Sequence, residues 1–106
     1  MWIFTKDGFV SIVQCDRQPR LLVVRGRVKG DVERLMACRG VFEDRDGHHD
    51  YRYRAYLDKD RVADKIAEHV CAIRYPNFKP AISDKRRHRY YFQIWDTAWE
   101  MQEQLA

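Results

Sequence analysis

Arginines are concentrated in two segments of the chain that have the pattern of β-strands. Arg25 and Arg27 lie two residues apart in the first segment, and Arg52 and Arg54 precede Tyr56 in the second. Side chains two residues apart on a strand point to the same side. If the two sides coincide, four guanidinium groups and a tyrosine ring share one surface. Such a surface suits nucleic acid, because guanidinium groups bind phosphates and aromatic rings stack on bases.

The same arginines have a simpler explanation. Arginines on strands also pair with Asp or Glu on the neighbouring strand, or keep an exposed sheet edge from aggregating. The sequence alone leaves both explanations open, and the positions of the carboxylates around these arginines decide between them.

A second basic cluster lies at the beginning of the last predicted helix. It comprises Lys85, Arg86, Arg87 and Arg89, with His88 among them. Cations at a helix N-terminus oppose the helix dipole, so their placement calls for an explanation. Binding of a phosphate or an acidic protein is one explanation, and a solvated linker between helices is the other.

His48, His49 and Asp50 indicate a third kind of chemistry. Two imidazoles beside a carboxylate, with arginines nearby, have the groups needed for metal-independent RNA cleavage. Exposed polar residues on a turn explain the same pattern. No ligand spacing typical of zinc, calcium or iron is present, and no glycine-rich phosphate loop or Gly-x-Ser-x-Gly motif occurs. We therefore expect no metal and no cofactor.

The composition predicts a single globular domain over residues 1–106. Hydrophobic residues make up 45% of the chain, which is enough for a core, and the formal charge of +4 weakly favours an anionic partner. No apolar run is long enough for a membrane span, and no secretory leader is recognisable. Three cysteines without close pairing favour a reducing compartment. We expect a cytoplasmic protein, of a bacterium or a phage-infected host.

The alternation of element types predicts an α+β fold. Asp7 and Gly8 separate two β-like runs and indicate a hairpin. Gly30 and Asp31 offer a helix N-cap, and Gly40 a stop. The predicted elements are strands over 2–5, 9–14, 21–28, 41–43 and 50–57, helices between 31 and 39, from about 60 to 73 and from 83 to 105, and an irregular connector over 75–80. We expect an antiparallel sheet of four or five strands with helices on one face, in the general style of ferredoxin-like domains.

The last predicted helix carries an unusually wide apolar face. One row of residues has the spacing of a core stripe: Tyr91, Ile94, Trp95, Ala98, Met101 and Leu105. A second row widens it with Phe92, Trp95 and Trp99. A small sheet needs less apolar surface than this, so we expect part of it to contact another chain, either as a homodimer or in a complex.

The chain resembles a family of small uncharacterised bacterial proteins that open with a sequence close to Trp-Ile-Phe-Thr-x-x-Gly-Phe-x-Ser-Ile-Val-Gln. Residues 2–14 match that opening. The resemblance continues through 24–28, 31–35, 53–55, 75–79 and 91–95. It implies a free-standing domain and carries no catalytic residue or activity. Residues 84–89 are more densely basic than the resemblance leads us to expect.

These patterns leave three functional hypotheses. The first is a non-enzymatic module that binds RNA or DNA through the arginine face and the basic helix start. The second is a protein-interaction or inhibitor domain, for example a phage-encoded antagonist of a nucleic-acid-handling defence complex, such as an anti-CRISPR protein. The third is a small metal-independent RNase.

Overall fold

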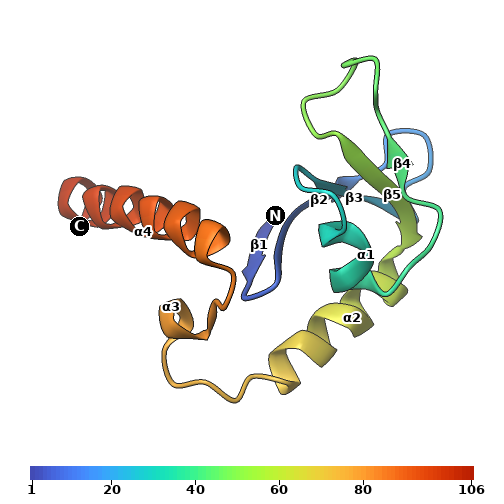
Figure 1. The fold of residues 1–106 in the computed structure, drawn as a ribbon. Helices are drawn as coiled ribbons and strands as arrows, with labels where there is room; N and C mark the ends of the chain where they lie inside the picture. The colour runs from blue at the N-terminus through green and yellow to red at the C-terminus, as the bar shows by residue number, and fades with distance from the viewer. The chain divides into compact units, whose positions relative to one another are not determined.

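The computed structural model describes residues 1–106 and divides the chain into two compact units (Figure 1). Residues 1–73 form an α+β unit, and residues 74–106 form a helical one. The predicted α+β class and the antiparallel sheet are confirmed. None of the helices combines the length and the apolar composition that a membrane span requires.

The first unit is built on a five-stranded antiparallel sheet in the order β1-β2-β3-β5-β4. Its strands are β1 Trp2–Thr5, β2 Gly8–Gln14, β3 Leu21–Gly26, β4 Phe42–Glu43 and β5 Tyr53–Asp58. Helix α1, Asp31–Met36, connects β3 to β4, and helix α2, Lys59–Cys71, follows β5. The first three strands therefore form a meander, the chain crosses through α1 to β4 at the sheet edge, and β5 returns to pair between β3 and β4.

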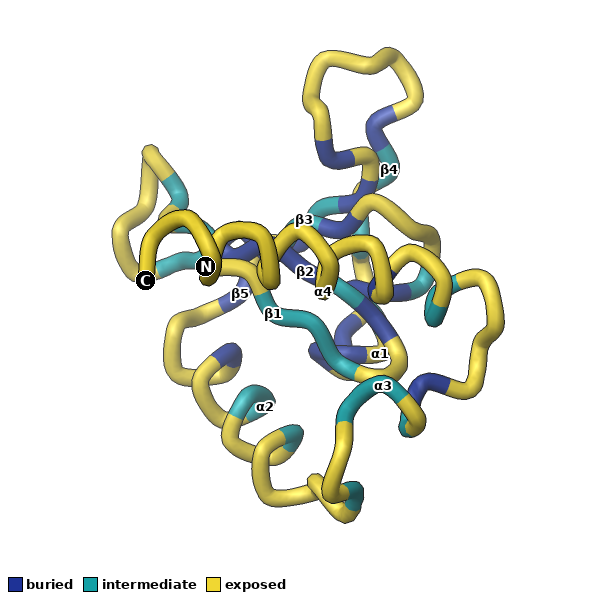
Figure 2. Tube along the Cα trace, turned by 90° about the vertical axis from the view of Figure 1, so that its left-hand side faces the viewer, coloured by how far each residue is buried: buried dark blue, intermediate teal, exposed yellow.

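Both helices of this unit pack on one face of the sheet, as predicted. Figure 2 shows the buried segments gathered in the strands and α1, whereas α2 is buried only near its beginning. The core residues are Val10 and Ile12 of β2, Val24 of β3, Ala55 and Leu57 of β5, Val32, Leu35 and Met36 of α1, and Val62 of α2. The opposite face of the sheet carries the arginines.

The predicted hairpin at Asp7 and Gly8 is present. Thr5 pairs with Gly8, and the Thr5 hydroxyl accepts a hydrogen bond from the Asp7 N–H at 3.2 Å. Glycine at position 8 allows close packing, since a Cβ there would lie 2.7 Å from Cδ1 of Leu35 and 3.1 Å from Cγ of Asp31. The hairpin therefore packs directly against α1.

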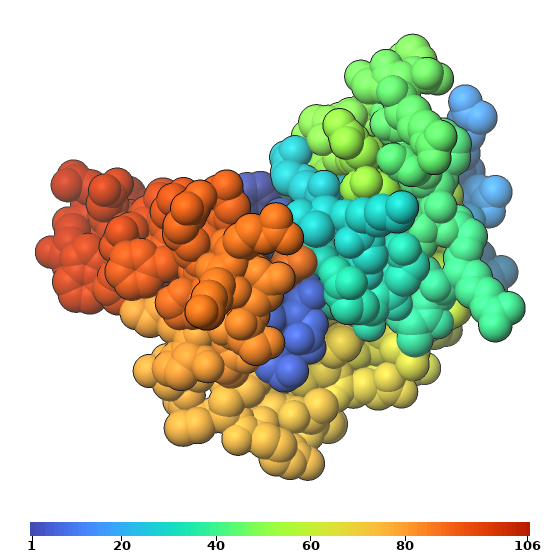
Figure 3. Space-filling model, viewed as in Figure 1, coloured from blue at the N-terminus to red at the C-terminus, as the bar shows by residue number.

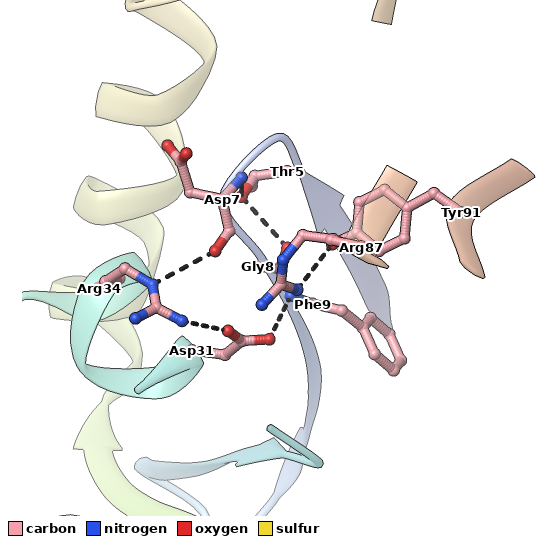
Figure 4. A network of polar contacts seen from close by, with 8 residues as sticks. All are labelled: Thr5, Asp7, Gly8, Phe9, Asp31, Arg34, Arg87 and Tyr91. Atoms are coloured by element: carbon pink, nitrogen blue, oxygen red, sulfur yellow. Dashed lines mark hydrogen bonds and ion pairs between the residues drawn. The ribbon is translucent and has the colours of Figure 1, made fainter. Parts of the chain in front are cut away.

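Helix α1 differs from its prediction at both ends. Gly30 is the N-cap, with φ of 91°, a left-handed conformation that favours glycine. Asp31 is instead the first helical residue, and its buried carboxylate lies between Phe9 and Arg34 (Figure 4). It accepts hydrogen bonds from the Phe9 N–H at 3.0 Å and from Nη2 of Arg34 at 2.6 Å. The helix ends at Met36, with Ala37 as its C-cap at φ of 48°, and does not continue to Gly40.

Two predicted strands are shorter than expected. The third ends at Gly26, so Arg27 lies outside it, because the chain turns there towards α1 and Asp31 N–H donates to the Val28 carbonyl. The fifth begins at Tyr53 and not at residue 50, because the chain bends before it. Arg52 therefore precedes the sheet.

The second unit consists of α3, Phe78–Ala81, and α4, Lys85–Leu105. Helix α3 is absent from the prediction, which placed an irregular connector there. The long helix is confirmed, and the Asp84 carboxylate caps it by accepting the N–H groups of Arg86 and Arg87 at 2.9 Å. The hydrogen bond from the Arg87 N–H is the main reason that the pKa of Asp84 lies below its ordinary value, although burial opposes it.

The predicted core stripe of α4 is wrong beyond its first member. Tyr91 is buried, and its ring stacks on Phe78 with centroids 5.9 Å apart. The exposed members are Ile94, Trp95, Ala98, Met101 and Leu105. Figure 2 shows α4 exposed over nearly its whole length. Within its unit, this 21-residue helix has only the four-residue α3 to pack on.

Candidate functional site

A single row of side chains crosses the open face of the sheet from edge to edge. It takes one residue from each strand, in the order Trp2, Ser11, Arg25, Arg54 and Phe42. Residues directly opposite each other in an antiparallel sheet share a face. The row therefore places two arginines at the centre and an exposed aromatic ring at each edge, with Trp2 67% and Phe42 58% exposed.

A shorter row runs beside the first. Val13, Val23 and Tyr56 are successive cross-strand partners on the same face. The two valines are largely covered, whereas Tyr56 is exposed. The predicted coincidence of Arg25, Arg54 and Tyr56 on one side of the sheet is thus observed.

Neither central arginine has an anionic partner. Arg25 donates from Nη2 to the Ser11 hydroxyl at 2.7 Å, and Arg54 has no side-chain hydrogen bond. No carboxylate oxygen lies within 4.0 Å of either guanidinium group. The Nε atoms of both are buried without a hydrogen-bond partner. Two like charges directly opposite each other destabilise a sheet, so this pair raises the free energy of the unbound protein.

Arg27 follows the simpler explanation. Its Nη2 lies 3.7 Å from a carboxylate oxygen of Asp50, and its Nη1 donates to the Asp50 carbonyl at 3.1 Å. Other arginines outside the sheet also pair, since Arg34 bonds to Asp31 and Arg45 to Glu43. Ion pairing therefore accounts for Arg27 but not for Arg25 and Arg54.

Tyr51 links Arg25 and Arg27. The guanidinium carbon of Arg27 lies 4.0 Å from the centroid of the Tyr51 ring, and that of Arg25 lies 4.6 Å from it. Both distances are those of cation–π contacts. Strand alternation would place Tyr51 with Tyr53 on the core face, but the bend before β5 brings its ring beside Arg25. Arg52, predicted on this surface, is exposed and has no such contact.

An open groove of about 860 Å³ lies on this part of the face. Its lining includes Arg25, Arg54 and Tyr56, the two valines of the shorter row, and the loop between β2 and β3. That loop contributes Arg17 and also one acid, Asp16. His49 is the one histidine that lines the groove. We call it the arginine groove.

The loop between β4 and β5 brings His49 to the groove. It projects from the sheet at the upper edge of Figure 3 and is tied down by Asp44. The buried Asp44 carboxylate accepts the His49 N–H at 2.6 Å, and the Asp44 N–H donates to the Arg52 carbonyl at 2.7 Å. Burial alone would raise the pKa of Asp44, but hydrogen bonds from the backbone N–H groups of His49, His48 and Asp46 lower it below its ordinary value. His48, the other histidine of the predicted catalytic pair, is not part of the groove lining.

The predicted basic cluster of Lys85, Arg86, Arg87 and Arg89 belongs to the other unit. Arg87 donates to the Tyr91 hydroxyl at 3.3 Å, and Arg89 lies over the Tyr90 ring at 5.3 Å. Lys85, Arg86 and Arg89 are exposed at the start of α4.

The predicted interface residues Phe92, Trp95 and Trp99 do form one aromatic row on α4. Ring centroids are 5.6 Å apart for Phe92 and Trp95, and 5.8 Å apart for Trp95 and Trp99. The ammonium of Lys79 lies 3.9 Å from the Trp95 centroid. All three rings are more than 40% exposed.

Sequence reasoning missed Tyr51, Ser11 and the two edge aromatics. Tyr51 is reached only through a bend that breaks the alternation. Trp2, Ser11 and Phe42 could have been found from strand pairing, since the hairpin register places Trp2 opposite Ser11.

Comparison of the chain with protein-family models, with curated proteins and with solved structures finds no match. The residues of the arginine groove and of α4 are therefore the only guide to function.

Proposed function

We propose that the open face of the sheet binds single-stranded nucleic acid, with the arginine groove holding the phosphates. The observation that carries this proposal is the cross-strand pair of Arg25 and Arg54, which has no carboxylate within 4.0 Å. A bound phosphate would supply the missing negative charge, and guanidinium groups bind phosphate strongly through paired hydrogen bonds.

The exposed rings around the pair favour a single strand. Tyr56 borders the groove, and Trp2 and Phe42 lie at the two ends of the central row. Unpaired bases stack on such rings, whereas the bases of a duplex are not accessible to them. The open face would therefore hold a single strand through two phosphate contacts and through stacking of bases on its aromatic rings, as in other sheets that bind single strands.

The test is fluorescence anisotropy of the full chain with labelled single-stranded RNA, single-stranded DNA and a duplex, over a range of salt concentrations. Two phosphate contacts predict a slope of about −1.4 in log K against log salt for a single strand. The slope will be steeper if the basic residues of α4 also contact phosphates. We expect both single strands to bind better than the duplex. Absence of binding at low salt, or binding that salt does not weaken, would refute the proposal.

A second function is favoured by α4. We propose that the aromatic row of Phe92, Trp95 and Trp99 is a protein-contact surface, as expected of a protein-interaction or inhibitor domain. Its support is the exposure of three neighbouring aromatic rings on one helix face. The test uses a Trp2→Phe variant, in which Trp95 and Trp99 are the only tryptophans. Acrylamide should quench their fluorescence in the dilute protein. Tryptophans shielded from acrylamide under these conditions would refute this function.

A further inference from the structure

Helix α4 separates its charges along a single strip of its surface. At about 100° per residue, five charged positions fall within a sector of about 60°. They are Lys85 and Arg89 in the N-terminal half, and Asp96, Glu100 and Glu103 in the C-terminal half. All five are exposed, and none forms an ion pair within the chain. The strip is positive at one end and negative at the other.

This arrangement is unfavourable for an isolated helix. Lys85 and Arg89 are like charges four residues apart, and so are Asp96 and Glu100, and such pairs destabilise a helix. The basic end also lies at the positive pole of the helix dipole and the acidic end at the negative pole. The Asp84 cap offsets part of the unfavourable charge at the N-terminus, but neither like-charge pair has an ion-pair partner within the chain.

The strip borders the aromatic row. On the same helical projection, Phe92, Trp99 and Trp95 occupy the sector of about 60° directly beside the charges. Lys79 of α3, whose ammonium lies over Trp95 and Phe92, adds a further cation at the N-terminal half of this border. An apolar row flanked by charges is the pattern by which helices choose the partner and the orientation of a coiled pair.

We propose that α4 pairs with α4 of a second copy of this chain in antiparallel orientation. The inference rests on the second proposed function, α4 as a protein-contact surface. If the helices cross near Ile94, Lys85 lies beside Glu103 of the partner subunit, and Arg89 lies beside Glu100 of the partner subunit. The aromatic rows meet at the centre, and the two helix dipoles oppose each other favourably. In a symmetric parallel pair the two strips would instead lie on opposite sides of the interface, so the basic and acidic ends would not meet.

Analytical ultracentrifugation of the full chain, freed of nucleic acid, tests this pairing. The wild type should dimerise at roughly 100 µM. Reversing one end of the strip, in Lys85→Glu/Arg89→Glu or in Glu100→Lys/Glu103→Lys, should weaken self-association at least about tenfold. A mixture of the two variants should form a heterodimer, and the variant with all four changes should again form a homodimer. Arg86→Glu, a charge reversal outside the strip, is the matched control and should dimerise like the wild type.

The outcomes separate this inference from the function on which it rests. A wild type that stays monomeric while its tryptophans are quenched by acrylamide overturns the self-pairing and leaves the contact surface standing. Tryptophans shielded in the dilute monomer overturn both. A dimer that neither charge reversal weakens, or a mixture that does not form a heterodimer, overturns the antiparallel pairing.

Discussion

Arg25 of β3 and Arg54 of β5 are direct neighbours across the sheet, and no carboxylate lies within 4.0 Å of either side chain. The arrangement resembles that of many binding sites, in which charges needed by the ligand destabilise the free protein. In the proposed complex, the phosphates of a single strand relieve the repulsion between the two arginines.

The first prediction is that removing one charge of this pair stabilises the free protein. Arg54→Met keeps an unbranched apolar stem as far as the position of Nε, and it removes the guanidinium charge and the buried, unpartnered Nε atom. We expect the free energy of unfolding to rise by about 0.5 kcal/mol. Urea denaturation at low and high salt measures it. The gain should shrink at high salt, because salt screens the repulsion between exposed charges. A destabilised variant at both salt concentrations would contradict this account of the pair.

The second prediction concerns Tyr51, whose ring lies against the guanidinium groups of Arg25 and Arg27. Tyr51→Phe keeps the aromatic face, so nucleic-acid affinity should stay within about twofold of the wild type. Tyr51→Leu removes the ring and lets both arginines move, and we expect affinity to fall about three- to tenfold. Anisotropy titrations of the two variants make the comparison. Equal affinity of the Leu and Phe variants would show that the ring does not position the arginines.

The third prediction concerns pH and the loop that carries His49. The pKa of Asp44 is lowered in the folded protein, so its contribution to stability is fully present above its ordinary value of 3.8. The contribution is lost as pH falls through the lowered folded-state pKa. NMR titration of the Asp44 carboxyl carbon should therefore show a midpoint below 3.8, together with shifts of the His49 amide.

Two matched variants, Asp44→Asn and Asp46→Asn, test the role of Asp44 as the anchor of this loop. The first weakens the acceptor for the His49 N–H and should increase amide exchange at His49 and lower nucleic-acid affinity. The second variant keeps all the backbone N–H groups that donate to Asp44, so neither the amide exchange at His49 nor the nucleic-acid affinity should change. Normal protection of the His49 amide in Asp44→Asn would rule out Asp44 as the anchor of the loop.

The fourth prediction concerns the buried carboxylate of Asp31, which joins α1 to the first hairpin. Asp31→Ala leaves the Phe9 N–H and Nη2 of Arg34 without their acceptor, and we expect a loss of about 2–4 kcal/mol in the free energy of unfolding. Arg34→Gln keeps the bond to Phe9 and should cost less than half as much. Chemical denaturation of both variants tests the order, and an equal loss in the two would contradict it.

The elements were largely predictable because their signals are local. Asp7 and Gly8 mark the hairpin, and strict alternation places Arg25 on one side of β3 and Arg54 and Tyr56 on one side of β5. Local signals also fixed the length of α4. Where the prediction failed, a longer-range contact decided the structure.

Tyr51 illustrates this limit, since its place beside Arg25 depends on a bend that Asp44 stabilises from the far side of the loop. Arg27 was expected in the sheet and instead pairs with Asp50, which is 23 residues away. On α4, the heptad-like pattern of Ile94 and Met101 correctly indicated an apolar face. Periodicity does not say what covers such a face, and so the predicted core stripe was wrong.

The most direct test of the central claim is the affinity of Arg25→Gln/Arg54→Gln for a single-stranded oligonucleotide, measured by anisotropy over a range of salt concentrations. The control is Lys29→Gln/Arg39→Gln, which removes two exposed charges of the same unit outside the groove. We predict that the groove variant binds at least about tenfold more weakly and that its salt slope is smaller by about 1.4, whereas the control keeps the wild-type slope. Equal losses of affinity in the two variants would mean that binding depends only on the net charge of the protein. That result would contradict the assignment of the phosphate site to Arg25 and Arg54.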